Sequence, residues 1–453
     1  MDLNKIHNIF FLGIGGIGMS ALARFFHARG ASVSGYDKTP TSLTHALHQQ
    51  GMQVFYQDNP EVIPADCQLV IYTPAVPATT RLFQAIEAQG LPLIKRARIL
   101  GIISEKIPTI AVAGTHGKTT ITTMIAHIMR TAGMNFSAFL GGISANYNTN
   151  FLGSIAPDWM VVEADEYDRS FLQLAPQIAV ISSMDADHLD IYGSTESMLD
   201  SFSLFAQKVH PEGLLILKQG LKLNQQIQAP VRDYHISHPA AHYAENIQVK
   251  NNTNQAQIKG LAPVEELVMG LAGKHNLENA LAAIAVCHHI GIDTHTIARA
   301  LASFKGVKRR FETIYHDDCR IFIDDYAHHP EELKASLNSA RELFPGRKIT
   351  AIFQPHLFSR TRDLAAGFVQ SLSLADELIL MEIYPAREAP IPGITSQWLL
   401  QQIPLDQKSL MTGEEVLETF IHRDIEVLLT LGAGNIDLLV EPLQKILQKK
   451  GQQ

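Results

Sequence analysis

Cysteine is scarce in this chain. Three cysteines are present, Cys67, Cys287 and Cys319, and they lie far apart. They cannot all pair with one another, and none of their spacings is Cys-x-x-Cys. A scaffold that depends on disulfides is therefore excluded, and we expect a cytoplasmic protein in a reducing environment.

Clusters of positive charge and long apolar runs are also missing. The formal net charge is -8, with no block of Lys and Arg of the kind that neutralises nucleic-acid phosphates. No apolar run reaches membrane-spanning length, and residues 1–11 lack the long apolar region and cleavage site of a secretory signal. We therefore expect neither nucleic-acid binding nor membrane insertion, and the choice between monomer and homodimer stays open.

Apolar segments typical of strands alternate with helical segments along all 453 residues. This alternation predicts an α/β fold with parallel sheets. Breaks in the pattern divide the chain into three expected domains, at 1–105, 106–312 and 313–453. The clearest expected strands are residues 9–12, 31–36, 69–72, 91–94, 109–113, 159–162, 178–182, 320–323, 349–353, 378–381 and 426–430.

The central block opens with a phosphate-binding pattern. A strand at 109–113 is followed by Gly114-Thr115-His116-Gly117-Lys118-Thr119-Thr120 and a helix that ends near Gly133. Backbone N–H groups at such a helix start face an anion, the Lys118 ammonium adds charge, and the Thr119 hydroxyl is placed for Mg²⁺. Val112 stands where the full pattern has its first glycine, so the segment alone predicts phosphate binding and no particular reaction.

Acidic residues end the next two expected strands of this block. Glu163 to Glu166 follow one strand, and Asp185, Asp187 and His188 follow the other. Ligands gather at the carboxyl ends of parallel strands, so Glu163 is the expected Mg²⁺ carboxylate and His188 a weaker candidate for the same or a second metal. Structural roles, as a hydrogen-bonded histidine or a helix cap, remain the alternative for His188 and the two aspartates.

The N-terminal block carries a second nucleotide motif. Four glycines in a strand-to-helix turn are followed by an acid at the end of the second strand: Gly13, Gly15, Gly16, Gly18 and Asp37. This spacing matches the dinucleotide fingerprint and would suit an NAD-dependent oxidoreductase. A UDP-linked sugar presents the same ribose and pyrophosphate, and the phosphate loop 100 residues later favours a nucleotide sugar together with ATP.

Several motifs together resemble the Mur ligases of peptidoglycan synthesis. They are residues 113–120, the Glu-Ala-Asp-Glu segment at 163–166, and Gly-Lys-His-Asn at 273–276. Residues 324–330, 353–363 and 382–388 are similar to the branch that adds L-alanine to UDP-N-acetylmuramate. The resemblance implies three domains: a Rossmann-like UDP-sugar domain, a central P-loop ATPase-type α/β domain, and a Rossmann-like α/β domain that closes over ATP and admits the amino acid.

The same resemblance implies ATP-dependent ligation through an acyl-phosphate, with Mg²⁺, or Mn²⁺ as an alternative. Catalytic roles fall to Lys118, Glu163, His188 and Arg360. Further ATP contacts are expected at His275, Asn276, Asn279, Arg310 and Asp325, and the amino-acid pocket at Tyr326, His328, His356 and Arg360. Asn276 could alternatively cap a helix. The runner-up activity is ligation of a whole tripeptide to the same UDP-sugar.

Two positions depart from the family pattern. Leu357 stands where some members have Arg, and Arg98 stands where Glu is common. The first departure puts one contact to the amino acid in doubt. Discrimination among L-alanine, glycine and L-serine cannot be predicted from the sequence, because one methyl or hydroxyl changes selectivity by only about 1 to 3 kcal/mol.

Overall fold

The computed structural model describes residues 2–185, 189–250, 253–386 and 388–451. The chain folds into two compact units. The first comprises Met1–Lys250, Asn254–Leu271 and Asn276–Lys305, and the second is mainly Gly306–Gln453. Among the described residues, no helix combines the length and apolar character needed to cross a bilayer.

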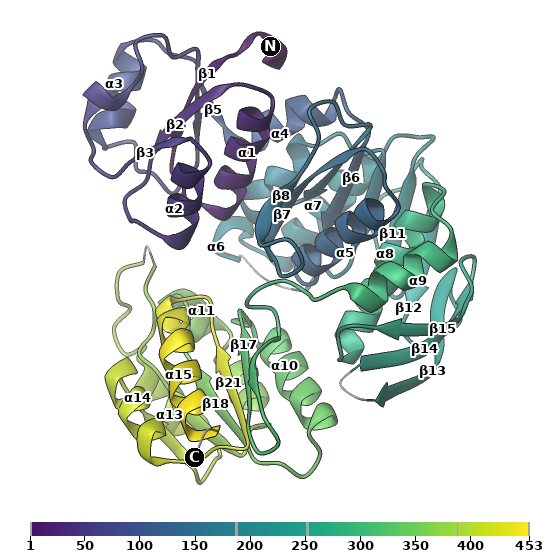
Figure 1. Cartoon of the computed structure of the whole chain (residues 1–453), viewed down its shortest axis with the longest axis vertical. Coiled ribbons are helices and arrows are strands. Elements are labelled where there is room, and N and C mark those ends of the chain that lie inside the picture. The colour runs from purple at the N-terminus through teal and green to yellow at the C-terminus, as the bar shows by residue number, and fades with distance from the viewer. Residues whose placement is uncertain (1, 186–188, 251–252, 387, 452–453) are drawn as a thin grey trace. The chain divides into compact units, whose positions relative to one another are not determined.

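The first unit begins with a five-stranded parallel sheet in the order β3-β2-β1-β4-β5 (Figure 1). Its strands are β1 Asn8–Leu12, β2 Ser32–Tyr36, β3 Gln53–Phe55, β4 Leu69–Tyr72 and β5 Leu93–Lys95. The connecting helices are α1 Ile17–Ala28, α2 Ser42–Gln49, α3 Arg81–Ala88 and α4 Arg96–Ser104. Parallel neighbours joined by crossover helices give this sheet the predicted Rossmann-like form.

A ten-stranded sheet follows, in the order β15-β14-β13-β12-β11-β10-β6-β9-β7-β8. Its strands are β6 Thr109–Ala113, β7 Phe136–Ser144, β8 Thr149–Leu152, β9 Trp159–Glu163, β10 Ile178–Ile181, β11 Leu214–Lys218, β12 Val231–His235, β13 His242–Lys250, β14 Thr253–Gly260 and β15 Val264–Met269. The predicted parallel pairing holds around β6, where β9 and β10 are its parallel neighbours, but the sheet is mixed, since β7–β8 and β14–β15 pair antiparallel. Each of these pairs is joined by a short turn, which only an antiparallel pair permits.

Apolar packing on the two faces of the central sheet explains why the first unit contains two sheets. On one face lie α5 Lys118–Thr131, α8 Lys274–His289 and α9 Thr294–Ser303. On the other, α7 Thr195–Gln207 packs on β9 and β10, while residues of α1, including Leu22 and Phe25, enter the same apolar cluster as Phe139. This shared core joins the N-terminal sheet to the central sheet.

The second unit is built on a six-stranded sheet in the order β16-β17-β21-β18-β19-β20. Its strands are β16 Glu312–His316, β17 Ile321–Asp325, β18 Ile349–Phe353, β19 Glu377–Leu380, β20 Lys408–Leu410 and β21 Val427–Leu431. Helices α10 Pro330–Leu343, α12 Ala365–Leu372 and α13 Ser396–Gln402 cover one face. Helices α14 Gly413–His422 and α15 Val440–Gly451 cover the other (Figure 1). Strand β16 pairs antiparallel with β17, so this sheet is mixed as well.

Candidate active site

The order of strands in the central sheet brings the predicted phosphate loop and acidic residues to one edge. Strand β6 pairs in parallel with β10 on one side and β9 on the other. The loop after β6 therefore lies between the carboxyl ends of β9, where Glu163 stands, and β10, which leads to Asp185. Such an edge is where open α/β sheets bind ligands.

The phosphate loop has the backbone that its glycines permit. Gly114 and Gly117 have φ of 137° and 84°, in the region that L side chains rarely adopt. Helix α5 begins at Lys118, so its first amides face the loop. Val112 is fully buried within β6, opposite Glu163 in the β9 register. The position of the missing glycine thus belongs to the strand and its core rather than to the loop.

Two serines that follow β10 contact this loop. The Ser183 hydroxyl accepts a hydrogen bond of 2.7 Å from the His116 amide and lies 3.0 Å from the Thr115 hydroxyl. A Cβ added at Gly114 would stand 2.2 Å from Ser182 Oγ. The Thr115 hydroxyl also accepts from the Asp185 amide at 3.1 Å. These contacts hold the loop against the segment that follows β10.

Lys118 is fully engaged within the protein. Its ammonium donates to the Gly114 carbonyl at 2.7 Å and to both carboxylate oxygens of Glu166 at 2.9 and 2.7 Å. Burial would lower the pKa of Lys118, but the carboxylates of Glu166, Asp165 and Glu163 outweigh it and raise that pKa. An ammonium has three donors, so contact with a phosphate requires Lys118 to give up one of these bonds.

Glu163 and Thr119 offer oxygen donors that suit Mg²⁺. Glu163 ends β9 and packs so tightly on β7 that a Cβ added at Gly141 would stand 2.0 Å from Glu163 Oε2. Thr119 is buried in the first turn of α5, and its hydroxyl makes no hydrogen bond to another described residue. The described residues contain no cluster of three His, Cys, Asp or Glu around a point. Mg²⁺ keeps several waters and binds through one or two carboxylates plus phosphate, so this sparse set fits it.

The glycine turn of the N-terminal sheet follows β1. Gly13 has φ of 86°, and its amide donates to the Tyr36 carbonyl at the end of β2. Gly16 is the N-cap of α1, with no side-chain cap for the first-turn amides. Asp37 braces the turn, because its carboxylate accepts from the Gly15 amide at 2.8 Å and the Thr39 amide at 3.3 Å. Its predicted contact with the nucleotide remains a prediction.

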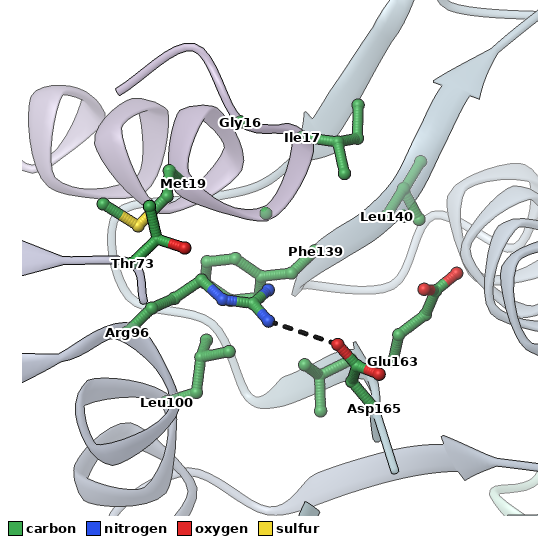
Figure 2. Close-up of a pocket in the computed structure, with 13 residues that line it drawn as sticks. Gly16, Ile17, Met19, Thr73, Arg96, Leu100, Phe139, Leu140, Glu163 and Asp165 are labelled. Atoms are coloured by element: carbon green, nitrogen blue, oxygen red, sulfur yellow. Dashed lines mark ion pairs between the residues drawn. The ribbon is translucent and has the colours of Figure 1, made fainter. Parts of the chain in front are cut away.

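A pocket of about 260 Å³ joins this turn to the acidic edge of the central sheet (Figure 2). Gly16 and Gly18 line one side, and Glu163 and Asp165 line the other. Arg96, the first residue of α4, crosses between them and pairs with Asp165 at 3.5 Å. The glycine turn of the N-terminal sheet and the acidic end of β9 thus open onto one cavity.

The two predicted asparagines of α8 belong to the first unit. Helix α8 begins at Lys274, so the alternative role of Asn276 as its cap is wrong, and this buried residue lies in the first turn. Asn279 packs against the phosphate loop, since a Cβ added at Gly117 would stand 2.6 Å from its Oδ1. The structure therefore brings Asn279 to the loop that sequence spacing alone did not connect with it.

The second unit gathers all four predicted amino-acid residues at the carboxyl ends of β17 and β18. The ring of His328 lies 5.4 Å from that of Tyr326 and 6.1 Å from that of His356. Arg360 is buried, with its guanidinium 3.4 Å from His356 Nδ1. Tyr384 stacks on His356 with ring centres 5.7 Å apart. These aromatic and cationic groups form a cluster suited to a small carboxylate ligand.

Three further residues predicted to contact ATP belong to the second unit, namely Arg310, Asp325 and His275. Arg310 packs over the Tyr326 ring at 5.3 Å. Asp325 ends β17, and burial raises its pKa to about 6 although Ser336 donates to it. His275 lies 3.1 Å from the Ser339 hydroxyl, and desolvation lowers its pKa to about 4. His188, the remaining catalytic candidate, lies outside the described residues.

Comparison with known proteins accounts for this arrangement. Three family models match in succession: "Mur ligase family, catalytic domain" at residues 8–107, "Mur ligase middle domain" at 112–287, and "Mur ligase, glutamate ligase domain" at 309–434. A UDP-N-acetylmuramate--L-alanine ligase of Parabacteroides distasonis is 44% identical over 99% of both chains. That of Flavobacterium johnsoniae is 45% identical over 99% of this chain and 100% of its own. The chain belongs to the Mur ligase family.

Solved structures place this Mur ligase in the same three-domain architecture. The crystal structure of the UDP-N-acetylmuramate-alanine ligase MurC from Thermotoga maritima matches with a TM-score of 0.84 and 28% identity, covering 98% of this chain and 99% of that one. A murein peptide ligase from Psychrobacter arcticus matches with a TM-score of 0.71 at 23% identity, covering 97% and 98%. The second likeness concerns the fold alone. The exact domain boundaries at 105 and 312 remain predictions.

Several residues at the site of this Mur ligase were missed from the sequence. Glu166 was given no role of its own, only a place in the Glu-Ala-Asp-Glu motif. Its position just after a strand that was expected to lie near the phosphate-binding Lys118 was a signal that could have predicted their contact. Ser183 and Arg96 gave no such signal, because their positions depend on strand order and on the packing of α4. The unusual Arg98 pairs with Glu105 at 3.3 Å on an exposed surface, and Leu357 caps α11 Phe358–Asp363 with φ of 72°.

Proposed function

We propose that this Mur ligase joins L-alanine to UDP-N-acetylmuramate with hydrolysis of ATP to ADP and phosphate. The observation that carries the proposal is the pocket that the Gly16–Gly18 turn shares with Glu163 and Asp165. Through this pocket a UDP-sugar bound at the turn can reach Glu163 at the end of β9, the strand that pairs with β6. Identity of 44–45% over the full length of ligases named for these two substrates supports the choice of substrates.

The first step activates the substrate carboxylate. A carboxylate oxygen of UDP-N-acetylmuramate attacks the γ-phosphorus of ATP, the bond to the β-phosphate oxygen breaks, and ADP leaves. The first-turn amides of α5 hold the phosphates, and the Lys118 ammonium, released in part from Glu166, neutralises charge on the transferring group. Thr119 and Glu163 would hold Mg²⁺, which when bound neutralises phosphate charge and orients the γ-phosphate.

The second step forms the amide. The neutral amine of L-alanine attacks the acyl carbon, phosphate leaves with the electron pair of the broken C–O bond, and the nitrogen loses a proton to solvent or a nearby base. An α-amino group with a pKa of about 8 is roughly one-tenth neutral at pH 7, a handicap of about 1.4 kcal/mol. Orientation of amine and acyl-phosphate is the larger contribution, since it supplies about 7 to 11 kcal/mol.

We assign recognition of L-alanine to the cluster of the second unit. A buried guanidinium such as Arg360 binds a carboxylate through two parallel hydrogen bonds. Tyr326, His328 and His356 surround that position with rings, and Arg310 and Asp325 are assigned to a phosphate and the ribose of ATP. The assignments of His275, Asn276 and Asn279 to the adenine region belong to the same proposal, as does a cytoplasmic location.

A phosphate-release assay tests the function. Purified protein with ATP and Mg²⁺ is expected to release phosphate only when UDP-N-acetylmuramate and L-alanine are both present, with UDP-N-acetylmuramoyl-L-alanine as product by mass spectrometry. Release that needs neither substrate contradicts an ordered ligase. Product formation with the tripeptide but not with L-alanine supports the recycling activity instead, and oxidation of NADH supports the oxidoreductase.

A further inference from the structure

Arg96 has no assigned role in the ligation, yet it occupies the middle of the pocket. It follows β5 directly and starts α4, so its backbone is fixed by the N-terminal sheet. Its guanidinium lies against the start of α1, because a Cβ added at Gly18 would stand 2.0 Å from Arg96 Nη1. From there it points across the cavity toward Asp165 (Figure 2). The side chain therefore spans the space that a bound sugar would enter.

The guanidinium of Arg96 keeps most of its donors available. A guanidinium carries five N–H groups, and the contact with Asp165 Oδ2 at 3.5 Å is an ion pair longer than an ordinary hydrogen bond. Within the described ranges, no protein acceptor forms a hydrogen bond with it, and 28% of the side chain is exposed. It can therefore offer two parallel donors to a planar anion.

The charges around the pocket indicate which anion this would be. Arg96 is the single cation among the described residues that line the cavity, whereas Glu163 and Asp165 are both acidic. A substrate carboxylate brought toward Glu163 would be repelled unless a cation accompanied it. The pyrophosphate has separate donors in the amides at the start of α1. We therefore expect Arg96 to pair with the substrate carboxylate rather than with the pyrophosphate.

Neighbouring contacts hold Arg96 in this orientation. The Asp165 carboxylate also accepts from the Tyr167 amide at 3.1 Å, so it is not free to turn away. Lys95 makes a parallel ion pair with Asp168 at 3.2 Å. Asp168 has φ of 53°, a strained value for a residue other than glycine. The Lys95–Asp168 pair is about half exposed on both sides and contributes little, so Asp165 is the partner that orients Arg96.

We propose that Arg96 binds the lactyl carboxylate of UDP-N-acetylmuramate and presents it for phosphorylation. The proposal rests on the ligase function above and adds the residue that selects a carboxylated UDP-sugar. The lactyl carboxylate that Arg96 binds distinguishes this substrate from UDP-N-acetylglucosamine. The latter has the same nucleotide, pyrophosphate and amino sugar but no lactyl ether. Loss of Arg96 should then remove selectivity for the carboxylate and leave recognition of the nucleotide intact.

The test is isothermal titration calorimetry with UDP-N-acetylmuramate, UDP-N-acetylglucosamine and UDP on wild type, Arg96→Gln, Arg96→Lys and Lys95→Gln. Arg96→Gln is expected to weaken UDP-N-acetylmuramate binding by about 10- to 100-fold, the value of a hydrogen-bonded charge, and to change binding of the other two by less than about threefold. Arg96→Lys should recover part of the loss, because it restores charge without the two-pronged geometry. Lys95→Gln is the matched control and should behave as wild type.

The outcomes separate this inference from the function on which it rests. Equal losses for UDP-N-acetylmuramate and UDP, or no loss for either, would overturn the role of Arg96 while leaving the ligase intact. Failure of the wild type to bind UDP-N-acetylmuramate would overturn both. In steady-state assays Arg96→Gln should raise KM for UDP-N-acetylmuramate and leave KM for ATP unchanged, and retained UDP binding shows that the variant is folded.

Discussion

Removal of the Lys118 charge is expected to destabilise the protein in a way that depends on pH. The carboxylate of Glu166 has 2% of its side chain exposed and is paired with Lys118 at 2.7 Å. Lys118→Met keeps most of the side-chain volume but leaves this buried carboxylate without its ammonium. Breaking a buried pair from one side costs about 3 to 5 kcal/mol. The variant can limit that cost by protonating Glu166.

The cost of protonation fixes the expected magnitude. For a carboxyl with an unfolded pKa of about 4.3, holding the proton at pH 7 costs about 3.7 kcal/mol, and at pH 5 about 1 kcal/mol. In the variant the folded pKa of Glu166 lies above the unfolded value, so stability is lost as pH rises from about 4.3 toward that folded pKa. In the wild type burial also raises the pKa of Glu166, but the Lys118 ammonium opposes that rise, and the carboxylates around Lys118 raise its own pKa and keep it charged. The deficit of the variant should therefore grow with pH.

Differential scanning calorimetry at pH 5 and pH 7 measures this difference. At about 2 °C per kcal/mol for a large domain, the deficit in Tm should be about 2 °C at pH 5 and about 7 °C at pH 7. Adding Glu166→Gln to Lys118→Met should recover most of the stability and abolish the dependence on pH. Both variants should lose ATP-dependent phosphate release. A deficit that is the same at both pH values, or a double variant less stable than the single one, would refute the reasoning.

Three further predictions concern the rest of the site. Asp325→Asn should stabilise the second unit above pH 6 by up to roughly 3 kcal/mol. The reason is that the raised pKa of Asp325, about 6, makes the folded protein lose stability as pH rises from about 4 to 6. Melting at pH 5 and pH 7 and weaker ATP binding check this, and equal Tm values for variant and wild type contradict it. Gly141→Ala should displace the Glu163 carboxylate, because the added Cβ would stand 2.0 Å from it, and should lower kcat by about 100-fold with a higher Mg²⁺ requirement. An unchanged kcat would show that Glu163 is not positioned by this contact. Arg360→Lys should raise KM for L-alanine by about 30-fold and leave KM for ATP unchanged. Arg362→Lys, at an exposed position on the same helix, serves as the control. An effect confined to ATP would remove Arg360 from the amino-acid pocket.

Elements whose structure depends on consecutive residues have the bounds that the sequence predicts. The strands at 69–72, 109–113 and 349–353 have the predicted bounds, and Gly133 directly follows the cap of α5 with φ of 71°. Short apolar runs bounded by turn residues are enough to define such strands. The antiparallel strands at the sheet edges were missed, because they alternate polar and apolar residues over short stretches and depend on their neighbours for burial.

The Gly114–Thr120 loop, the Gly13–Gly18 turn and the family resemblance were determined by the sequence itself, since their chemistry resides in consecutive residues. Which of these segments share a site was decided by the tertiary structure. Strand order placed the phosphate loop between the ends of β9 and β10, and packing of α1 and α4 on the central sheet carried Arg96 to Asp165. Contacts between residues far apart in the chain arise from burial and sheet register, which no single segment encodes.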